Sequence, residues 1–334
     1  MNNLFINRQI WNNFTEDEMN IYIDNVYNYY KEKGFPYFST DENFRNTEYD
    51  KFINYDDSNI FKNDILNQTM HGLSLAWSYF PHSFNVKCNN KLTPLEAYNN
   101  DEIFKKVIIR RIKMGSNMSD NGIRKMIKIF TNVQSVSNFR PTTASAIYKN
   151  YNNKIVWDMS GGFGGRLLGA IKSNVEKYIC TEPSTLSYEG LIKLNNDFGN
   201  KNYEFYKIGS EDFIPNKESL DLCFTSPPYF NTEKYSNEDT QSCNKFQDKE
   251  NWLNNFLKKT FENCYFGLKN NSHMLINIAN VPAYKKLEED TIKIATETGF
   301  ILNKTLKYSL SNVSMGVKKE KFKYEPIFDF IKIL

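Results

Sequence analysis

The chain has 334 residues, enough for one large or two ordinary domains with cores of their own. Charged residues make up 24% and hydrophobic residues 40%, as in soluble globular proteins, and the net charge of +3 permits a nucleic-acid partner without demanding one. No apolar run approaches the roughly 20 residues of a membrane helix, and the first residues, MNNLFINRQIWNN, lack the apolar core of a signal peptide. We therefore expect a cytoplasmic protein without a membrane partner.

The cysteines argue against a disulfide framework and against a zinc site. They are odd in number, widely spaced and without a CxxC pair: Cys88, Cys180, Cys223, Cys243 and Cys264. The three histidines are scattered as well, so we expect reduced thiols and no metal.

The first part of the chain, residues 1–135, reads as mainly helical. Thr15 and Thr93 each open a capping box, and Asp101 and Ser119 begin two further helical patterns. Its sequence shows no repeat of fixed period and no long linker.

From residue 136 onward, short apolar runs alternate with helical patterns. Such alternation favours an α/β fold whose sheet is mainly parallel, and ligands of such sheets bind at the carboxyl ends of the strands. The last two runs have no clear helix between them, so we expect one strand to run antiparallel. The seven predicted strands are 154–158, 177–181, 203–208, 220–225, 273–279, 301–310 and 326–333.

A glycine-rich loop follows the first of these strands, in VWDMSGGFGGRLLGA (156–170). The strand ends at Asp158, and Gly161, Gly162 and Gly164 let the backbone turn sharply and leave room for a ligand before the next helix. A tight turn without a ligand is the alternative. The spacing is not GxGxxG, although a dinucleotide stays open, and no GxxxxGK[ST] phosphate loop occurs.

Two acidic residues follow the next two strands. Glu182 stands 24 positions after Asp158 (182 − 158), where an acid can accept hydrogen bonds from both ribose hydroxyls of a nucleoside cofactor. Asp212, in GSEDF, could accept from an adenine amino group. The alternatives are a solvated surface acid for Glu182 and a loop acid or helix cap for Asp212.

The most specific signal is the tetrapeptide Ser226-Pro227-Pro228-Tyr229, after the fourth strand. Proline cannot continue a sheet ladder, so the strand stops there and presents the carbonyl groups of Ser226 and Pro227. A bare turn rarely needs a serine, two prolines and an aromatic residue together.

Taken together, these motifs resemble the class I S-adenosylmethionine-dependent amino-methyltransferases that act on DNA. The resemblance covers about residues 136–334 and implies a seven-stranded Rossmann-like sheet with helices on both faces, beside the mainly helical N-terminal region. It implies that Asp158, the glycine loop, Glu182 and Asp212 bind S-adenosyl-L-methionine and that the tetrapeptide binds a flipped base. The loop reads DMSGGFGG and departs from the commoner FxGxG form.

The segment NFRPTTASAIY (138–148) resembles the part of that family which closes over the methionine end of the cofactor, and this makes Phe139 a candidate cofactor contact. A capped helix that packs on the sheet is the alternative.

The chemistry of the tetrapeptide fits amino methylation. An exocyclic amino nitrogen is a poor nucleophile because its lone pair is delocalised into the ring. The Ser226 hydroxyl and the Pro227 carbonyl can accept hydrogen bonds from its two N–H groups, and the prolines hold these acceptors in place. Tyr229 can stack on the base. The sulfonium already activates the methyl group, so neither a metal nor a covalent intermediate is required.

Several targets remain open. In the family that the chain resembles, serine at the first tetrapeptide position favours cytosine N4, while adenine N6 of DNA, an RNA amino group, and an inactive cofactor- or DNA-binding accessory protein are alternatives. Methylation of cytosine carbon 5 would need a Pro-Cys pair, and no proline here precedes a cysteine.

DNA reading is assigned to residues 1–135, because only about 60 residues separate the two motif loops. The basic candidates are KKVIIRRIK (105–113), Arg124-Lys125 and VKKEKFK (317–323), although such charges are often the solvated face of packed helices. The polar segment 230–246 is a candidate lid with Glu233, Tyr235 and Gln241 as base contacts, and a solvated connection is its alternative. A cognate restriction enzyme is a candidate partner, and the sequence does not give the oligomeric state.

Overall fold

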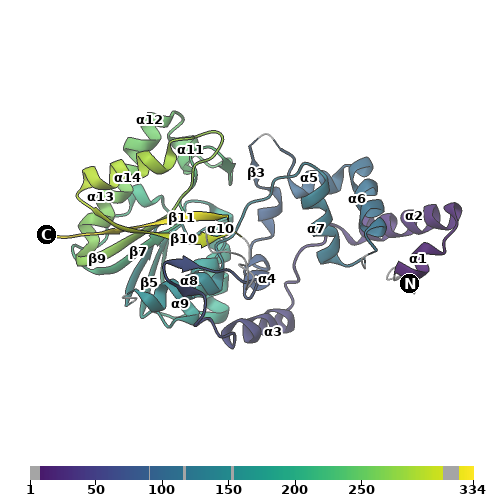
Figure 1. The fold of residues 1–334 in the computed structure, drawn as a ribbon, viewed down its shortest axis with the longest axis horizontal. Coiled ribbons are helices and arrows are strands. Elements are labelled where there is room, and N and C mark those ends of the chain that lie inside the picture. The colour runs from purple at the N-terminus through teal and green to yellow at the C-terminus, as the bar shows by residue number, and fades with distance from the viewer. Residues whose placement is uncertain (1–7, 90, 116–117, 152–153, 311–322) are drawn as a thin grey trace. The chain divides into compact units, whose positions relative to one another are not determined.

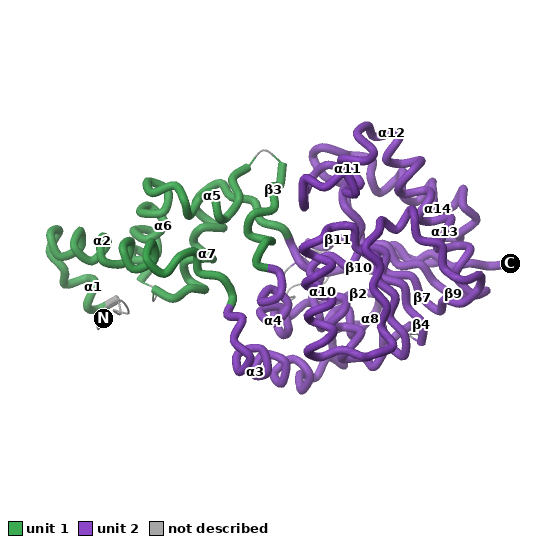
Figure 2. The backbone as a smooth tube through the Cα atoms, turned by 180° about the vertical axis from the view of Figure 1, so that it is seen from behind, with its two compact units in different colours: residues 1–38, 81–136 green, residues 39–80, 137–334 purple. Residues whose placement is uncertain are grey.

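The computed structural model describes residues 8–334 except 90, 116–117, 152–153 and 311–322, so most of the basic segment 317–323 lies outside it. The chain forms two compact units: residues 1–38 with 81–136, and residues 39–80 with 137–334 (Figure 2). Among the described residues, no helix is long and apolar enough to cross a membrane.

Unit 1 is built almost entirely from short helices. The capping boxes at Thr15 and Thr93 are both present, and Ser119 caps its helix by accepting from the backbone N–H of Gly122. Its elements are α1 (Arg8–Asn12), α2 (Glu16–Lys33), the 3₁₀ turn η1 (Pro81–Asn85), β3 (Lys87–Cys88), α5 (Pro94–Asn99), α6 (Asp101–Lys113) and α7 (Asp120–Phe130).

The core of unit 1 fixes part of its basic surface. Apolar side chains of α2, α6 and α7 form one buried cluster that includes Tyr30, Phe104 and Ile123. Arg124 is drawn into this packing, because its guanidinium donates to the Pro36 carbonyl at 2.7 Å and lies over the Phe38 ring at 3.9 Å. Arg124 is therefore a structural residue of the helix packing.

Unit 2 contains the strand–helix alternation. Its elements are α3 (Glu42–Ile53), β1 (Phe61–Lys62), β2 (Ile65–Leu66), α4 (Leu73–Trp77), α8 (Pro141–Asn150), β4 (Ile155–Asp158), α9 (Gly165–Lys172), β5 (Lys177–Thr181), α10 (Thr185–Phe198), β6 (Glu204–Tyr206), the 3₁₀ turn η2 (Ser210–Asp212), β7 (Leu220–Thr225), β8 (Glu233–Lys234), α11 (Ser242–Lys245), α12 (Lys249–Trp252), the π-helical turn η3 (Leu253–Leu257), α13 (Lys258–Gly267), β9 (Leu268–Asn277), α14 (Leu287–Thr298), β10 (Ile301–Ser309) and β11 (Tyr324–Ile331).

The sheet of unit 2 has the strand order β1-β2-β10-β11-β9-β7-β4-β5-β6 (Figure 1). The seven predicted strands are all present, as β4, β5, β6, β7, β9, β10 and β11. β4, β5, β6, β7 and β9 run parallel, and β11 pairs antiparallel with both β9 and β10, which confirms the expected reversed strand. Among the described residues the sheet has nine strands, because the hairpin β1–β2 adds to β10.

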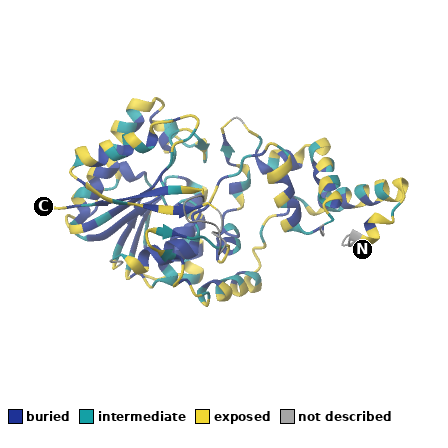
Figure 3. Cartoon of the chain, viewed as in Figure 1, coloured by how far each residue is buried: buried dark blue, intermediate teal, exposed yellow. Residues whose placement is uncertain are grey.

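Helices cover both faces of this sheet, as predicted. On one face Phe224 of β7 contacts Tyr148 of α8, with ring centroids 5.8 Å apart. On the other face Trp157 of β4 belongs to a buried cluster with Phe261 of α13 and Ile294 of α14. β4, β5, β7 and β11 are accordingly buried along most of their length, whereas β10 is exposed over much of its first half, and other exposed residues lie on the outer sides of the helices (Figure 3).

Residues 39–80 differ from the expected division, which placed them in the helical N-terminal region. They belong to unit 2, because β2 pairs with β10 and because two aromatic side chains pack against the glycine loop. The ring centroids of Trp77 and Phe80 lie 5.3 and 5.8 Å from that of Phe163. The two-residue strands are too short to show a period in sequence.

Candidate active site

The glycine loop and the tetrapeptide leave the sheet from neighbouring strands. β4 and β7 pair in parallel through Val156 with Leu222 and Trp157 with Cys223, and the loops after them start at the same edge. In the order β6-β5-β4-β7-β9, the connections run one way from β4 to β6 and the other way from β7 to β9. This is the topological switch point, where open α/β sheets bind their ligands.

The glycines serve two purposes in the loop after β4. At Gly161 a Cβ atom would lie 2.4 Å from the Cys180 sulfur, so the loop can lie this close to β5 only without a side chain. Gly162 has φ of +58°, and the nearest atom to a Cβ there would be 3.8 Å away. The loop is therefore packed below and open beside Gly162, as a ligand cradle requires.

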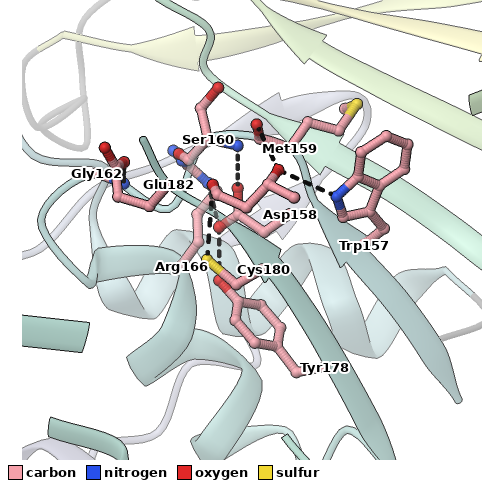
Figure 4. Close-up of polar contacts among 10 residues, drawn as sticks. Trp157, Asp158, Met159, Ser160, Gly162, Arg166, Tyr178, Cys180 and Glu182 are labelled. Atoms are coloured by element: carbon pink, nitrogen blue, oxygen red, sulfur yellow. Dashed lines mark hydrogen bonds and ion pairs between the residues drawn. The ribbon is translucent and has the colours of Figure 1, made fainter. Parts of the chain in front are cut away.

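Asp158 is a buried anchor of this loop. Its side chain is fully buried, and its carboxylate accepts from Arg166 Nε at 2.9 Å, from the Tyr178 hydroxyl at 2.5 Å and from the Ser160 N–H at 3.2 Å (Figure 4). Arg166 also donates to the Ser160 carbonyl. Burial alone would lower the pKa of Arg166, but attraction to Asp158 outweighs it and raises that pKa. Asp158 thus supports the loop from beneath.

Glu182 is placed where the sequence predicted an acceptor, at the end of β5. Its carboxylate lies beside Gly162 (Figure 4) and accepts from the Gly162 N–H at 2.8 Å. It also accepts from the Ser184 N–H at 2.9 Å. Burial, as the largest cause, raises its pKa to about 7. A carboxylate has about four acceptor positions, so two remain for a ligand that lies on the loop.

The acid predicted after β6 has a more buried neighbour. The side chain of Asp212 is 55% exposed, whereas that of Glu211 is 3% exposed, and Lys245 pairs with both at 2.5 and 2.9 Å. The Oε2 atom of Glu211 is buried, and no group of the described residues donates a hydrogen bond to it. Burial, more than any other cause, raises the pKa of Glu211. Glu211 therefore joins Asp212 as a candidate acceptor at this position.

The tetrapeptide forms the other half of the site. Pro227 is buried, while Ser226, Pro228 and Tyr229 are half-buried at the end of β7. The Ser226 side chain lies within hydrogen-bonding reach of the Tyr229 hydroxyl, which donates to the Asn277 carbonyl at 3.4 Å. Ser226 and Tyr229 therefore lie together at the carboxyl edge, where the end of β7 meets the end of β9.

Phe139 packs as a core residue, and its neighbour contacts the loop. Its ring stacks on Tyr308 at 4.9 Å and meets Phe224 edge-on at 5.2 Å. Asn138 donates to the Phe163 carbonyl at 2.8 Å, which links this segment to the glycine loop. Phe139 is 7% exposed, so its side chain leaves a cofactor little surface to contact.

The segment after the tetrapeptide docks on the cofactor side of the edge. The Glu238 carboxylate accepts from the Thr185 N–H at 3.1 Å, and Thr240 Oγ1 donates to the Pro183 carbonyl at 3.1 Å. Gln241 is buried and its Nε2 has no partner among the described residues. Glu233 accepts a hydrogen bond from Tyr235.

The sequence analysis did not predict the residues that hold the candidate site residues in place. Arg166, Asn138, Glu211 and Lys245 hold or surround the predicted residues, and although they lie inside segments that we singled out, none of them was a candidate. For Arg166 alone a signal exists, because an arginine eight residues after a strand-terminal aspartate lies in the first turn of the helix that follows the loop and can reach back to it.

The second half of unit 2 matches a family of known proteins. Residues 220–333 match the family model N6_N4_Mtase, described as DNA methylase. No curated protein sequence matches the chain.

Solved structures that resemble the chain include a SAM-dependent methyltransferase from Methanosarcina mazei (TM-score 0.40, 10% identity, 56% of this chain and 97% of that one). A SAM-dependent O-methyltransferase from Thermotoga maritima has a TM-score of 0.41, with 11% identity over 60% of this chain and 68% of that one. A methyltransferase from Pyrococcus furiosus has a TM-score of 0.41, with 15% identity over 63% of this chain and 94% of that one.

The family match includes Ser226 to Tyr229 and extends through β11. It confirms that the chain resembles the DNA amino-methyltransferases in the part that carries the tetrapeptide, since residues 220–333 match the DNA methylase model.

Proposed function

We propose that this protein transfers a methyl group from S-adenosyl-L-methionine to an exocyclic amino nitrogen of a flipped base in DNA, with cytosine N4 as the favoured target. One observation carries the proposal: the glycine loop and the Ser226–Tyr229 tetrapeptide leave paired strands at the switch point of the sheet. A cofactor on one loop and a base on the other would then meet above β4 and β7.

The residues on the cofactor side fit a nucleoside with a diol and an amino group. Glu182 offers acceptor positions beside the open backbone of Gly162, and Glu211 holds a buried oxygen to which no described residue donates. Glu182 would hold the ribose, and Glu211 with Asp212 would hold the adenine amino group. The bound cofactor supplies an electrophilic methyl group on a sulfonium.

The residues on the base side activate and orient the nucleophile. Ser226 Oγ and the Pro227 carbonyl accept hydrogen bonds from the two N–H groups of the amino group. This favours a lone pair on the nitrogen that is directed at the incoming methyl carbon. Pro227 and Pro228 fix these acceptors before the base arrives, so little ordering is left for the reaction itself. Tyr229 packs partly against the buried cluster of β4, β7 and β9 and is held for stacking.

We propose that unit 1 contacts DNA. Two of its basic candidate residues are already paired with acidic side chains. Lys105 pairs with Asp24 at 3.0 Å and Lys106 with Glu102 at 2.6 Å. Lys113 and Lys125 are exposed, and we propose that they contact phosphates.

Mass spectrometry of nucleosides tests the function. The protein is incubated with methyl-labelled cofactor and with DNA or RNA, and the digested nucleic acid is analysed. We expect label in N4-methyl-2′-deoxycytidine from DNA. Label in N6-methyladenine would move the target to adenine, and label only in RNA would refute the DNA substrate. A folded protein that binds S-adenosylhomocysteine but labels neither would favour an accessory role.

A further inference from the structure

Residues 236–246, which we call the strap, join the two loops that carry the candidate cofactor acids. The first half of the strap is tied to the connection between β5 and α10. There the Thr240 hydroxyl donates to the Pro183 carbonyl at 3.1 Å, and the Glu238 carboxylate accepts from the Thr185 N–H at 3.1 Å. This connection begins with the acid that we propose for the ribose.

The second half of the strap is tied to the turn after β6. The Lys245 ammonium, on α11, donates to Glu211 at 2.9 Å and to Asp212 at 2.5 Å. Burial alone would lower the pKa of Lys245, but its hydrogen bonds to these two acids outweigh burial and raise that pKa. A charged ammonium group therefore bridges the two acids that we propose for the adenine.

Glu211 is held so that one of its oxygens is engaged and the other is left over. Its carboxylate folds back over the backbone of Gly209, where a Cβ atom would overlap it. Lys245 donates to Oε1, while Oε2 is buried and receives no hydrogen bond from the described residues. A buried oxygen of this kind calls for a donor from a ligand.

The amino group of adenine is such a donor, whereas hypoxanthine has a carbonyl oxygen at the same position. An ionised carboxylate can only accept, so hypoxanthine would set one acceptor against another. Without Lys245, Glu211 and Asp212 would lose the cation that they share, and two neighbouring acids raise the pKa of each other. A protonated Glu211 can donate to the hypoxanthine oxygen, so the preference for adenine would fade.

We propose that Lys245 is a positioning residue that holds Glu211 as an acceptor for the adenine amino group, which makes the strap part of the cofactor site. The inference rests on the proposed function, since it names how the same site selects its cofactor.

The test compares two ligands that differ at this one position. Calorimetry measures the Kd of S-adenosylhomocysteine and of S-inosylhomocysteine, which carries hypoxanthine in place of adenine. The proteins are the wild type, Lys245→Met, Lys245→Arg and the exposed control Lys201→Met. The Lys245 side chain is 34% exposed, so its replacement should leave the fold intact, and urea unfolding checks this for each variant.

We expect the wild type and the Lys201→Met control to bind S-adenosylhomocysteine about tenfold to hundredfold more tightly than the inosine analogue, the cost of two facing acceptors. Lys245→Met should lose most of this preference. Lys245→Arg should restore it, because a guanidinium group can also donate to two carboxylates.

Equal affinities of the wild type for the two ligands would overturn the assignment. A Lys245→Met variant that weakens both ligands equally, and so keeps the preference, would overturn it as well, since Lys245 would then have only a structural role. A folded wild type that binds neither ligand would instead refute the proposed function, and this inference with it.

Discussion

Removing Arg166 tests whether Asp158 supports the cofactor loop from beneath. The side chains of Asp158 and Arg166 are 0% and 6% exposed, and their 2.9 Å contact neutralises two charges that water does not reach. Arg166→Met keeps the apolar length of the side chain but leaves the carboxylate with only Tyr178 and the Ser160 N–H. Breaking one side of a buried ion pair costs about 3–5 kcal/mol.

The double variant Asp158→Asn with Arg166→Met separates the stability contribution of the ion pair from that of the packing around it. With neither charge present, no buried carboxylate is left uncompensated, so we expect a loss well below that of Arg166→Met alone. The assay is urea unfolding followed by intrinsic fluorescence, because three of the four tryptophans, Trp77, Trp157 and Trp252, lie in unit 2 and only Trp11 lies in unit 1. Arg166→Met should also weaken S-adenosylhomocysteine binding, since Arg166 donates to the Ser160 carbonyl within the loop.

The outcome that refutes the reasoning is specific. If Arg166→Met unfolds at the same urea concentration as the wild type, Asp158 is not held by a buried ion pair. If the double variant is as unstable as Arg166→Met, the loss comes from packing and not from an uncompensated charge.

Three further predictions concern the cofactor cradle and the DNA surface. Because burial raises the pKa of Glu182 to about 7 and the ionised carboxylate accepts from both hydroxyls of a diol more strongly than the protonated acid does, S-adenosylhomocysteine affinity should rise as the pH increases through about 7, and Glu182→Gln should flatten this dependence in calorimetry. Gly161→Ala should destabilise unit 2 by about 1–3 kcal/mol, since its Cβ would lie 2.4 Å from the Cys180 sulfur; an unchanged unfolding midpoint would contradict the packing. Lys113→Gln and Lys125→Gln should each lower DNA affinity and reduce the salt slope by about 1, and an unaltered slope would exclude phosphate contacts at these lysines.

The sequence predicted most of the sheet because its signals are local and strong. Each of the seven strands is an apolar run, and a buried strand needs such a run whatever its neighbours are. The sequence also predicted that the motifs after β4, β5 and β7 lie at one edge of the sheet, because parallel strands bring their carboxyl ends together. The reversed β11 followed from the missing helix between the last two runs.

What the sequence did not predict depends on contacts between distant residues. The hairpin β1–β2 joins the sheet through β10, some 240 residues later, and two-residue strands show no period. Both Glu211 and Asp212 are acids in GSEDF, so the sequence does not show which of them is the buried acceptor. The rest of the fold decides this, because it buries Glu211 and leaves Asp212 exposed.

The central claim is that the tetrapeptide activates the amino group while the glycine loop holds the cofactor. It is tested most directly by comparing Ser226→Ala and Tyr229→Ala with the wild type in single-turnover methyl transfer and in S-adenosylhomocysteine binding. The account predicts that methyl transfer is abolished or strongly reduced in both variants while cofactor affinity is largely unchanged. Transfer at the wild-type rate by either variant would contradict it.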